Sequence, residues 1–136
     1  MMRGVLVDSN VLLDVITQDP VWYEWSAAAL EECGSTSALY LNPIIYAEVS
    51  VGYARIEDLE AALPKALHRL PLPWEAAFLA GKAFLRYRRR GGARTSTLPD
   101  FFIGAHAAVS GLRLLTRDDR RYRSYFPRVE FVGAEG

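Results

Sequence analysis

The sequence predicts an α/β protein, a single-domain α/β/α sandwich with a mostly parallel central sheet. Strand-like and helix-like patterns alternate along all 136 residues, which is typical of parallel strands joined by right-handed crossovers with helices on both faces. The run Val5-Leu6-Val7 is apolar without interruption, as expected of a strand covered on both faces. No internal repeat, low-complexity tract or linker divides the chain, so we expect one domain over residues 1–136.

The first half of the chain predicts two strands and three helices. The strands are expected at 5–7 and 38–41, and the helices at 11–16, 22–32 and 43–53. Asp19-Pro20 separates the first two helices, because a proline disfavours the helical conformation of the residue before it. Gly34 is expected to stop the second helix. Asn42 and Pro43 match an N-cap followed by a first-turn proline, so they predict the start of the third.

The second half predicts three strands and four helices. The strands are expected at 70–72, 113–116 and 129–132, and the helices at 56–67, 74–90, 99–110 and 119–125. Pro64 must kink or divide the first of these helices, and Pro71 weakens the strand that contains it. Gly91-Gly92 ends the long helix that starts at Trp74.

Composition limits the class of protein. The chain is 51% hydrophobic and 12% aromatic, which indicates a globular protein and excludes a disordered one. Its one cysteine, Cys33, cannot form an internal disulfide, and the N-terminus lacks a signal-peptide pattern, so a cytoplasmic location is expected. The longest uncharged apolar run, 101–112, is too short to span a bilayer, so no membrane association is predicted.

Charge is unevenly distributed along the chain, although the net charge is zero. Residues 1–85 carry 5 basic and 11 acidic side chains, giving −6, whereas residues 86–128 carry 11 arginines and three aspartates, giving +8. All 11 cations of the basic segment are arginine, the residue suited to bidentate contacts with phosphate. A net charge near zero also favours association with a partner or self-assembly.

Two acidic residues in the first half do not fit their surroundings. Asp8 directly follows the first strand, where ligands of open α/β sheets gather, although a helix N-cap is the alternative interpretation. Glu48 shares a helical stripe with Ile44, Ile45 and Val49, so it faces the sheet or its rim unless it bends out to water. A buried, unpaired carboxylate is costly, and a bound cation would remove that cost.

Two further acids are expected at the same edge of the sheet. Asp100 opens a predicted helix and Asp118 follows the fourth strand, although a first-turn residue and an N-cap are their respective alternatives. Four carboxylates there would repel one another by about 4 kcal/mol per close pair at a dielectric near 20. Mg²⁺ or Mn²⁺, which prefer oxygen ligands, would relieve the repulsion. One cysteine with His68 and His106 offers no zinc-ligand spacing.

Four acidic motifs, in chain order, resemble the PIN-domain ribonucleases and above all the VapC toxins of bacterial type II toxin–antitoxin pairs. The motifs are VLVDSNVLLD at 5–14, Glu48 in its helix, LPDFFIGAHA at 98–107 and LLTRD at 114–118. The resemblance covers essentially the whole chain. It implies an Mg²⁺- or Mn²⁺-dependent endoribonuclease, held inactive by a cognate VapB-like antitoxin and forming a homodimer. Hydrolysis by a metal-activated water would leave a 5′-phosphate and a 3′-hydroxyl.

The resemblance also assigns residues. It places the catalytic acids and metal ligands on Asp8, Glu48, Asp100 and Asp118, with Asn10 and Thr116 as polar support. Asp14 and Asp119 fall outside the acidic positions of the family. We expect Asp14 to be solvated or to lie behind the ligands, and Asp119 to belong to the first turn of a helix.

Arginines near the predicted acidic edge are candidates for RNA binding, because dense cations neutralise phosphates. They are Arg86, Arg88, Arg89, Arg90, Arg94 and Arg117. The alternative for the first four is a solvated helix end that is favourable to the helix dipole. The aromatic residues Trp22, Tyr23, Trp25 and Trp74 are expected in the core, or in a groove for the antitoxin or a second copy.

Other functions fit the sequence less well or stay open. A phosphohydrolase of the haloacid dehalogenase type needs a second aspartate two residues after the first, where this chain has Asn10. A receiver-like phosphoacceptor needs an aspartate at the end of the third strand, and a PIN-type module that only binds would not need a complete acidic set. A PIN nuclease of RNA processing or ribosome maturation stays open, as does cleavage of DNA, because four acids do not distinguish RNA from DNA.

Overall fold

A five-stranded sheet forms the centre of the molecule in the computed structural model, which describes residues 3–91 and 97–134. The strands are β1 (Val5–Val7), β2 (Leu39–Leu41), β3 (Leu67–Arg69), β4 (Arg113–Thr116) and β5 (Phe131–Gly133). Their order in the sheet is β3-β2-β1-β4-β5, and every pair of neighbours is parallel. The predicted α/β/α sandwich is therefore confirmed, with a sheet that is parallel throughout.

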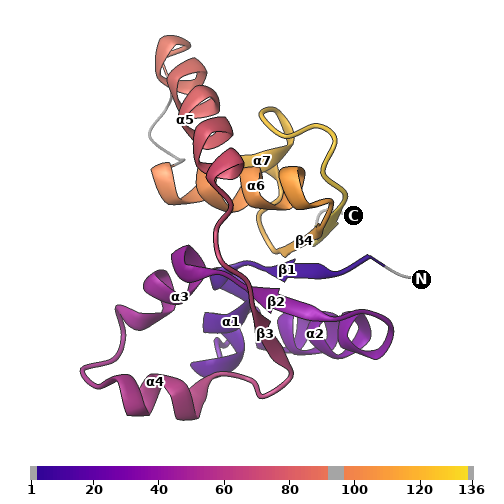
Figure 1. The fold of residues 1–136 in the computed structure, drawn as a ribbon. Helices are drawn as coiled ribbons and strands as arrows, with labels where there is room; N and C mark the ends of the chain where they lie inside the picture. Colours follow the sequence, from indigo (N-terminus) through magenta and orange to yellow (C-terminus); the bar gives the residue numbers. More distant parts are fainter. Residues whose placement is uncertain (1–2, 92–96, 135–136) are drawn as a thin grey trace.

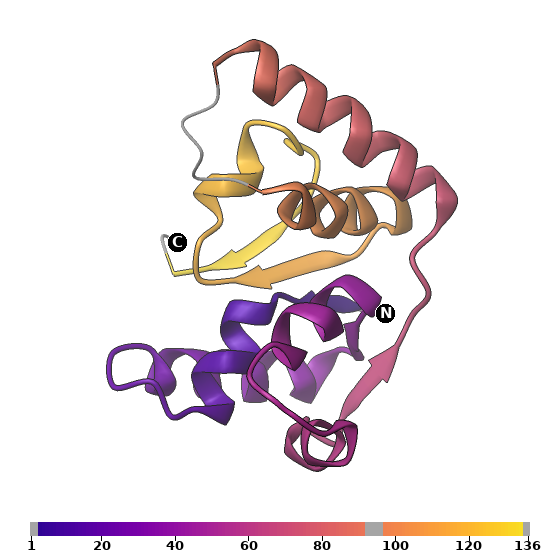
Figure 2. The same cartoon turned by 90° about the vertical axis from the view of Figure 1, so that its left-hand side faces the viewer.

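Helices cover both sides of the sheet (Figures 1 and 2). They are α1 (Ser9–Ile16), α2 (Tyr23–Thr36), α3 (Pro43–Ser50), α4 (Ile56–Ala62), α5 (Trp74–Arg89), α6 (Leu98–Ser110) and α7 (Arg120–Arg123). Helices α1 to α4 lie on one side of the sheet and α5 to α7 on the other (Figure 2). Right-handed crossovers require this division, because the chain first runs outward from β1 to β3 and then returns to β4 and β5.

The strand order reverses between β1 and β4, at the centre of the sheet. In open α/β sheets ligands bind outside the carboxyl ends of the strands at such a switch point. All three residues of β1 are fully buried, and Leu114 and Leu115 of β4 are buried beside them. The two strands that lead to the edge where Asp8 and Asp118 were predicted to meet are therefore part of the core.

Several element boundaries differ from those predicted. Helix α4 ends at Ala62 and not at Leu67, because Pro64 follows at once and cannot continue it. The freed chain forms β3 at Leu67–Arg69, so the prediction of a strand at 70–72 was wrong by three residues. Gly34 does not stop α2, which continues to Thr36. The last strand begins at Phe131, because the amide of Val129 is bonded to the carbonyl of Phe126 in a turn.

The other helix ends and the aromatic residues also differ in detail. Helix α3 ends at Ser50, before the expected Tyr53, and α7 covers only Arg120–Arg123. Trp74 is 88% exposed at the start of α5, so the expectation that it lies in the core is wrong, whereas a surface for a partner or a second copy stays a prediction. Among the described residues, no helix is long and apolar enough to cross a membrane.

Candidate active site

Asp8 is the most deeply buried of the four predicted acids, with 4% of its surface exposed. It ends β1 and caps α1, where its Oδ1 accepts a hydrogen bond of 2.7 Å from the amide of Ser9. Its Oδ2 accepts hydrogen bonds from Thr116 Oγ1 at 2.9 Å and from the Tyr122 hydroxyl at 2.8 Å. The capping role considered from the sequence is therefore real, and residues from β4 and α7 also hold the carboxylate.

Burial controls the ionisation of this group. It raises the pKa of Asp8 above its ordinary value, the hydrogen bonds of Tyr122 and Thr116 oppose that rise, and the nearby charge of Asp100 adds to it. Burial and the neighbouring Asp8 and Asp100 charges likewise raise the pKa of Tyr122 well above its usual range. The tyrosine therefore stays protonated and donates its hydrogen to Asp8.

Tyr122 was missed in the sequence, where it matches any core aromatic residue of a short helix. It reaches Asp8 because α7 packs very closely on α6 at Gly104. A Cβ at residue 104 would overlap the ring of Phe126 and lie 3.1 Å from Tyr122 Cδ1. The glycine in the motif at 98–107 therefore permits the contact between Tyr122 and Asp8.

Glu48 joins the site from α3. Its Oε1 accepts a hydrogen bond of 2.8 Å from Ser9 Oγ, which also lies 3.4 Å from Asp8 Oδ1. The carboxylate is half-buried and does not simply extend into water. Burial raises the pKa of Glu48, the Ser9 hydrogen bond opposes this, and the charges of Asp8 and Asp100 raise it further. The structure thus brings Asp8, Glu48 and Asp100 within electrostatic range of one another.

Asp100 and Asp118 lie on the other side of the switch point. Asp100 is 6% exposed in the first turn of α6, and its Oδ2 accepts a hydrogen bond of 3.0 Å from the amide of Thr97. Asp118 is half-exposed, and it is not the N-cap of α7, a position that Asp119 takes. The guanidinium of Arg121 connects the two acids, with Nε 2.7 Å from Asp118 Oδ2 and one terminal nitrogen 3.5 Å from Asp100 Oδ2. Sequence reasoning did not single out Arg121.

Asn10 and Thr116 hold the loop between β4 and α7. Thr116 Oγ1 accepts hydrogen bonds from Asn10 Nδ2 at 3.2 Å and from the amide of Asp118 at 3.1 Å, while donating to Asp8. Asn10 Oδ1 accepts a hydrogen bond of 3.4 Å from the amide of Arg117. These contacts suit the polar support expected of both residues, since they tie Asp118 to the end of β1.

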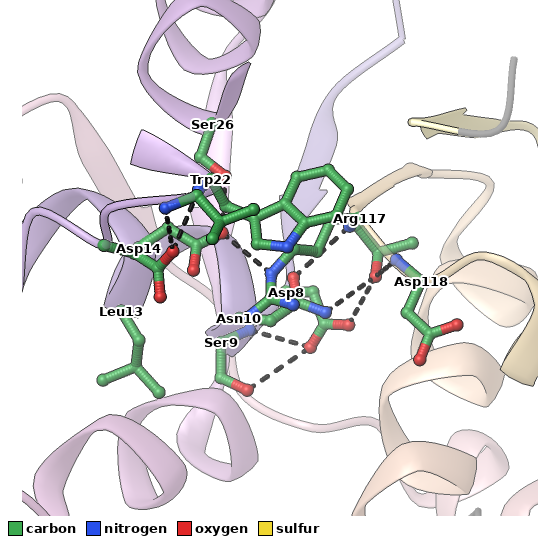
Figure 3. A network of polar contacts seen from close by, with 12 residues as sticks. Asp8, Ser9, Asn10, Leu13, Asp14, Trp22, Ser26, Arg117 and Asp118 are labelled. Atoms are coloured by element: carbon green, nitrogen blue, oxygen red, sulfur yellow. Dashed lines mark hydrogen bonds and ion pairs between the residues drawn. The ribbon is translucent and has the colours of Figure 1, made fainter. Parts of the chain in front are cut away.

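Arg117 and Asp14 form a second connection between this loop and α1 (Figure 3). Asp14 is 1% exposed, and its Oδ2 lies 2.9 Å from Arg117 Nε and 2.7 Å from Ser26 Oγ. The guanidinium of Arg117 also lies over the ring of Trp22, 5.3 Å from its centroid. The expectation that Asp14 could be solvated is wrong. The RNA contact suggested for Arg117 stays a prediction, but its Nε is occupied by Asp14.

Two charged sets remain, Asp119 and the basic end of α5. Asp119 is fully buried, and its Oδ2 is bonded to Arg123 Nε at 2.6 Å. The basic residues Arg86, Arg88, Arg89 and Arg90 are exposed at the C-terminal end of α5. That end lies on the same side of the molecule as the carboxyl end of β4 (Figure 2). Arg94, also predicted to bind RNA, lies outside the described residues.

The chemistry of the acids suits a hard divalent cation. All four donors are carboxylates, which Mg²⁺ and Mn²⁺ prefer. Burial raises the pKa of Asp8 and of Glu48, and the charge of Asp100 raises both further. Over residues 3–91 and 97–134, no group of three or more His, Cys, Asp or Glu side chains is already arranged to hold a metal. Glu48 and Asp118 are only half-buried, and each is held by one neighbour, Ser9 and Arg121 respectively.

Comparison with known proteins identifies the family. The family model described as "PIN domain" matches residues 5–131, so the chain belongs to the PIN domain family. PIN domains are nucleases, and membership places the chain among hydrolases that act on nucleic acid. No curated protein sequence gives a significant match.

Solved structures share the fold at low sequence identity. A chain of VapBC2 from Rickettsia felis, bound to a DNA fragment from its promoter, aligns with a TM-score of 0.74 and 16% identity over 95% of this chain and 97% of that one. A chain of DNA-bound VapBC from Salmonella typhimurium aligns with a TM-score of 0.71 and 19% identity, over 97% of this chain and 98% of that one. A chain of a toxin–antitoxin complex from Klebsiella pneumoniae aligns with a TM-score of 0.66 and 23% identity, over 88% of this chain and 90% of that one.

The ion pair between Asp14 and Arg117 provides a test of how the loop is held. Asp14→Ala would leave the Arg117 guanidinium without its buried partner and Ser26 without an acceptor, so we expect unfolding to become easier by about 1–3 kcal/mol. Urea denaturation followed by circular dichroism measures the change. Glu57→Ala is the control, because its pair with Arg55 is exposed on both sides and should contribute below about 1 kcal/mol. Equal effects of the two substitutions would contradict the role of Asp14.

Proposed function

We propose that the chain is a divalent-metal-dependent endoribonuclease that acts as the toxin of a toxin–antitoxin pair. The observation that supports this most is the gathering of the predicted acids at the switch point of a PIN-domain sheet. The charge of Asp100 raises the pKa of Asp8, and the charges of Asp8 and Asp100 raise that of Glu48. Arg121 joins Asp100 to Asp118. The acids come from four different elements, so their proximity is a property of the fold and not of any single motif.

The roles of the residues follow from their surroundings. A bound Mg²⁺ or Mn²⁺ would supply the positive charge that the attacking and leaving oxygens of a phosphodiester require. Asp8, fixed by three hydrogen bonds, is the proposed central ligand, and Asp100, Asp118 and Glu48 complete the set. Glu48 is half-buried, has a raised pKa and is suited to accept the proton of the attacking water. Attack of water at phosphorus and cleavage of its bond to O3′ leave a 5′-phosphate and a 3′-hydroxyl.

Replacing the central acid tests the nuclease. Asp8→Asn is expected to abolish cleavage of RNA, because it removes the charge of the proposed central ligand while keeping the shape of the side chain. Purified protein would be incubated with a panel of RNAs and matched DNAs in Mg²⁺ or Mn²⁺, and products resolved by gel electrophoresis. Cleavage by the unchanged chain should stop when a chelator is added.

An exposed aspartate provides the matched control for this test. Asp58→Asn, in the first turn of α4, should cleave like the unchanged chain. Circular dichroism and thermal unfolding would establish that both variants keep the fold. Undiminished cleavage by Asp8→Asn, or cleavage unaffected by chelator, would overturn the proposed site, and cleavage of DNA alone would overturn the proposed substrate.

The arginines at the end of α5 are the proposed RNA-binding arm, together with Arg94. They are exposed, and Arg86 and Arg90 lie within 6.0 Å and 5.7 Å of the centroid of the Tyr125 ring, which provides a platform beside the cations. Arg117 is the proposed contact nearest to the acids, made through the part of its guanidinium that Asp14 does not engage.

Salt dependence measures this arm directly. For single-stranded RNA, each lost phosphate contact reduces the slope of log K against log salt by about 0.7. The double variant Arg88→Gln/Arg89→Gln should therefore reduce the slope by about 1.4, as measured by fluorescence anisotropy with a labelled RNA. Lys82→Gln removes an exposed cation earlier on the same helix and should leave the slope unchanged. An equal slope in the unchanged chain, the double variant and Lys82→Gln would contradict RNA binding by the arginines at the end of α5.

A partner chain and a second copy complete the proposal. The structural neighbours are chains of VapBC and toxin–antitoxin complexes, which supports a VapB-like antitoxin as the partner. A homodimer is supported by an apolar stripe on the outer side of α5. Trp74 is 88% exposed, Phe78 is 69% exposed, and Gly81 has open space around it.

Co-expression with a neighbouring reading frame tests the toxin. A short upstream frame with a DNA-binding N-terminus is expected. Its product should co-purify with the chain, relieve the growth arrest expected of the chain alone and inhibit cleavage. Light scattering on the complex would give the number of copies of each chain. An active nuclease without such a neighbour would favour the alternative, a PIN nuclease of RNA processing or ribosome maturation.

A further inference from the structure

Arg121 is a cation placed among acids that are expected to bind another cation. It is the second residue of α7, one turn after Asp118, and its side chain is 42% exposed. One edge of its guanidinium engages Asp118 through Nε at 2.7 Å, and a terminal nitrogen lies 3.5 Å from Asp100. Burial lowers the pKa of Arg121, but the charges of Asp100 and Asp118 raise it by more, so the side chain stays charged.

Its contacts are well placed but easily exchanged. The pair with Asp118 is half-exposed on both sides, 42% and 40%, so solvent screens it and little is lost when it opens. The distance to Asp100 is longer than that of a good hydrogen bond between charged groups. A divalent cation carries twice the charge and is a stronger competitor for the same oxygens than a guanidinium.

If a metal ion displaced it from the acids, the Arg121 guanidinium would stay close to the phosphate that is to be cleaved. Arg121 lies on the same short helix as Tyr122, which is fixed to Asp8, so the backbone of Arg121 is anchored while its side chain is free to turn. The planar fork of an arginine matches the oxygens of a phosphate with two parallel hydrogen bonds. An acidic site that must receive a polyanion needs such a group, because the carboxylates repel the substrate.

We propose that Arg121 and a divalent cation bind Asp100 and Asp118 in turn, and that the guanidinium released by the metal binds the phosphate to be cleaved. The proposal rests on the nuclease function proposed above, because the competing cation is the metal of that nuclease. In the metal-free chain Arg121 neutralises two of the acids. In the loaded chain it contacts the substrate and is a catalytic residue.

Metal affinity tests the first half without any measurement of activity. Titration calorimetry with Mn²⁺ on the full chain should show Arg121→Gln binding the metal about 3- to 10-fold more tightly than the unchanged protein, because its competitor is gone. Arg121→Lys keeps the charge and should stay close to the unchanged protein. Arg128→Gln, which removes an exposed arginine after α7, controls for net charge and should change the affinity by less than about 2-fold.

Cleavage at saturating metal tests the second half. Arg121→Gln should lower kcat/KM for RNA by about 10-fold or more, and Arg121→Lys by less, because a single ammonium replaces the fork. A variant that binds metal more tightly yet cleaves RNA more slowly is not explained by loss of structure, which would weaken both. Arg128→Gln should keep the unchanged kcat/KM.

The outcomes separate this inference from the proposed function. If the unchanged chain cleaves RNA but Arg121→Gln has the same or weaker metal affinity, only the exchange is overturned. Undiminished kcat/KM in Arg121→Gln at saturating metal overturns the contact between Arg121 and the phosphate, and leaves the proposed nuclease standing. An unchanged chain that binds no metal or cleaves no nucleic acid overturns the proposed function, and the exchange with it.

Discussion

Burying the carboxylate of Asp8 beside two other carboxylates costs free energy, and the surrounding hydrogen bonds reduce that cost. The Ser9 amide, Thr116 and Tyr122 each donate to it, and they belong to three different elements of the fold. Removing one donor would leave a buried charge less well solvated, which costs about 1–3 kcal/mol. The position of Asp8 therefore constrains α1, β4 and α7 at the same time, and the rest of the site is built on that arrangement.

Several independent contacts hold the loop after β4 against α1. Thr116 and Asn10 fix its backbone to the start of α1, and the buried pair of Arg117 with Asp14 fixes a side chain to the middle of the same helix. Asp118, between these anchors and α7, keeps a half-exposed side chain. A fixed backbone with a half-exposed carboxylate would suit the ligand role proposed for Asp118, because Mg²⁺ keeps several of its waters.

The sequence predicted the sheet and its direction, and it proposed four acids for one edge of that sheet, because each depends on local patterns and on topology. An apolar run followed by a carboxylate defines the end of a strand, and parallel strands bring such ends to one edge. The contacts that refine the site depended on packing and could not be predicted. Tyr122 reaches Asp8 only because Gly104 lets α7 approach α6, and Arg121 reaches two acids only because of how α7 is oriented. Asp14 resembled a surface residue because its partners, Ser26 and Arg117, are remote in sequence.

The same topology explains why opposite charges are divided between the halves of the chain. The acidic first half supplies Asp8 and Glu48 from one side of the switch point, and the basic second half supplies Asp100, Asp118 and the arginines from the other. Folding brings the halves together, so the site proposed to bind cations lies near the surface proposed to bind phosphates. Arg121 belongs to both the acidic and the basic groups of side chains. It contacts Asp100 and Asp118, and its own side chain is partly exposed to solvent. A chain with zero net charge can therefore attract a metal ion and a polyanion to neighbouring positions, which a uniformly acidic or basic surface could not do.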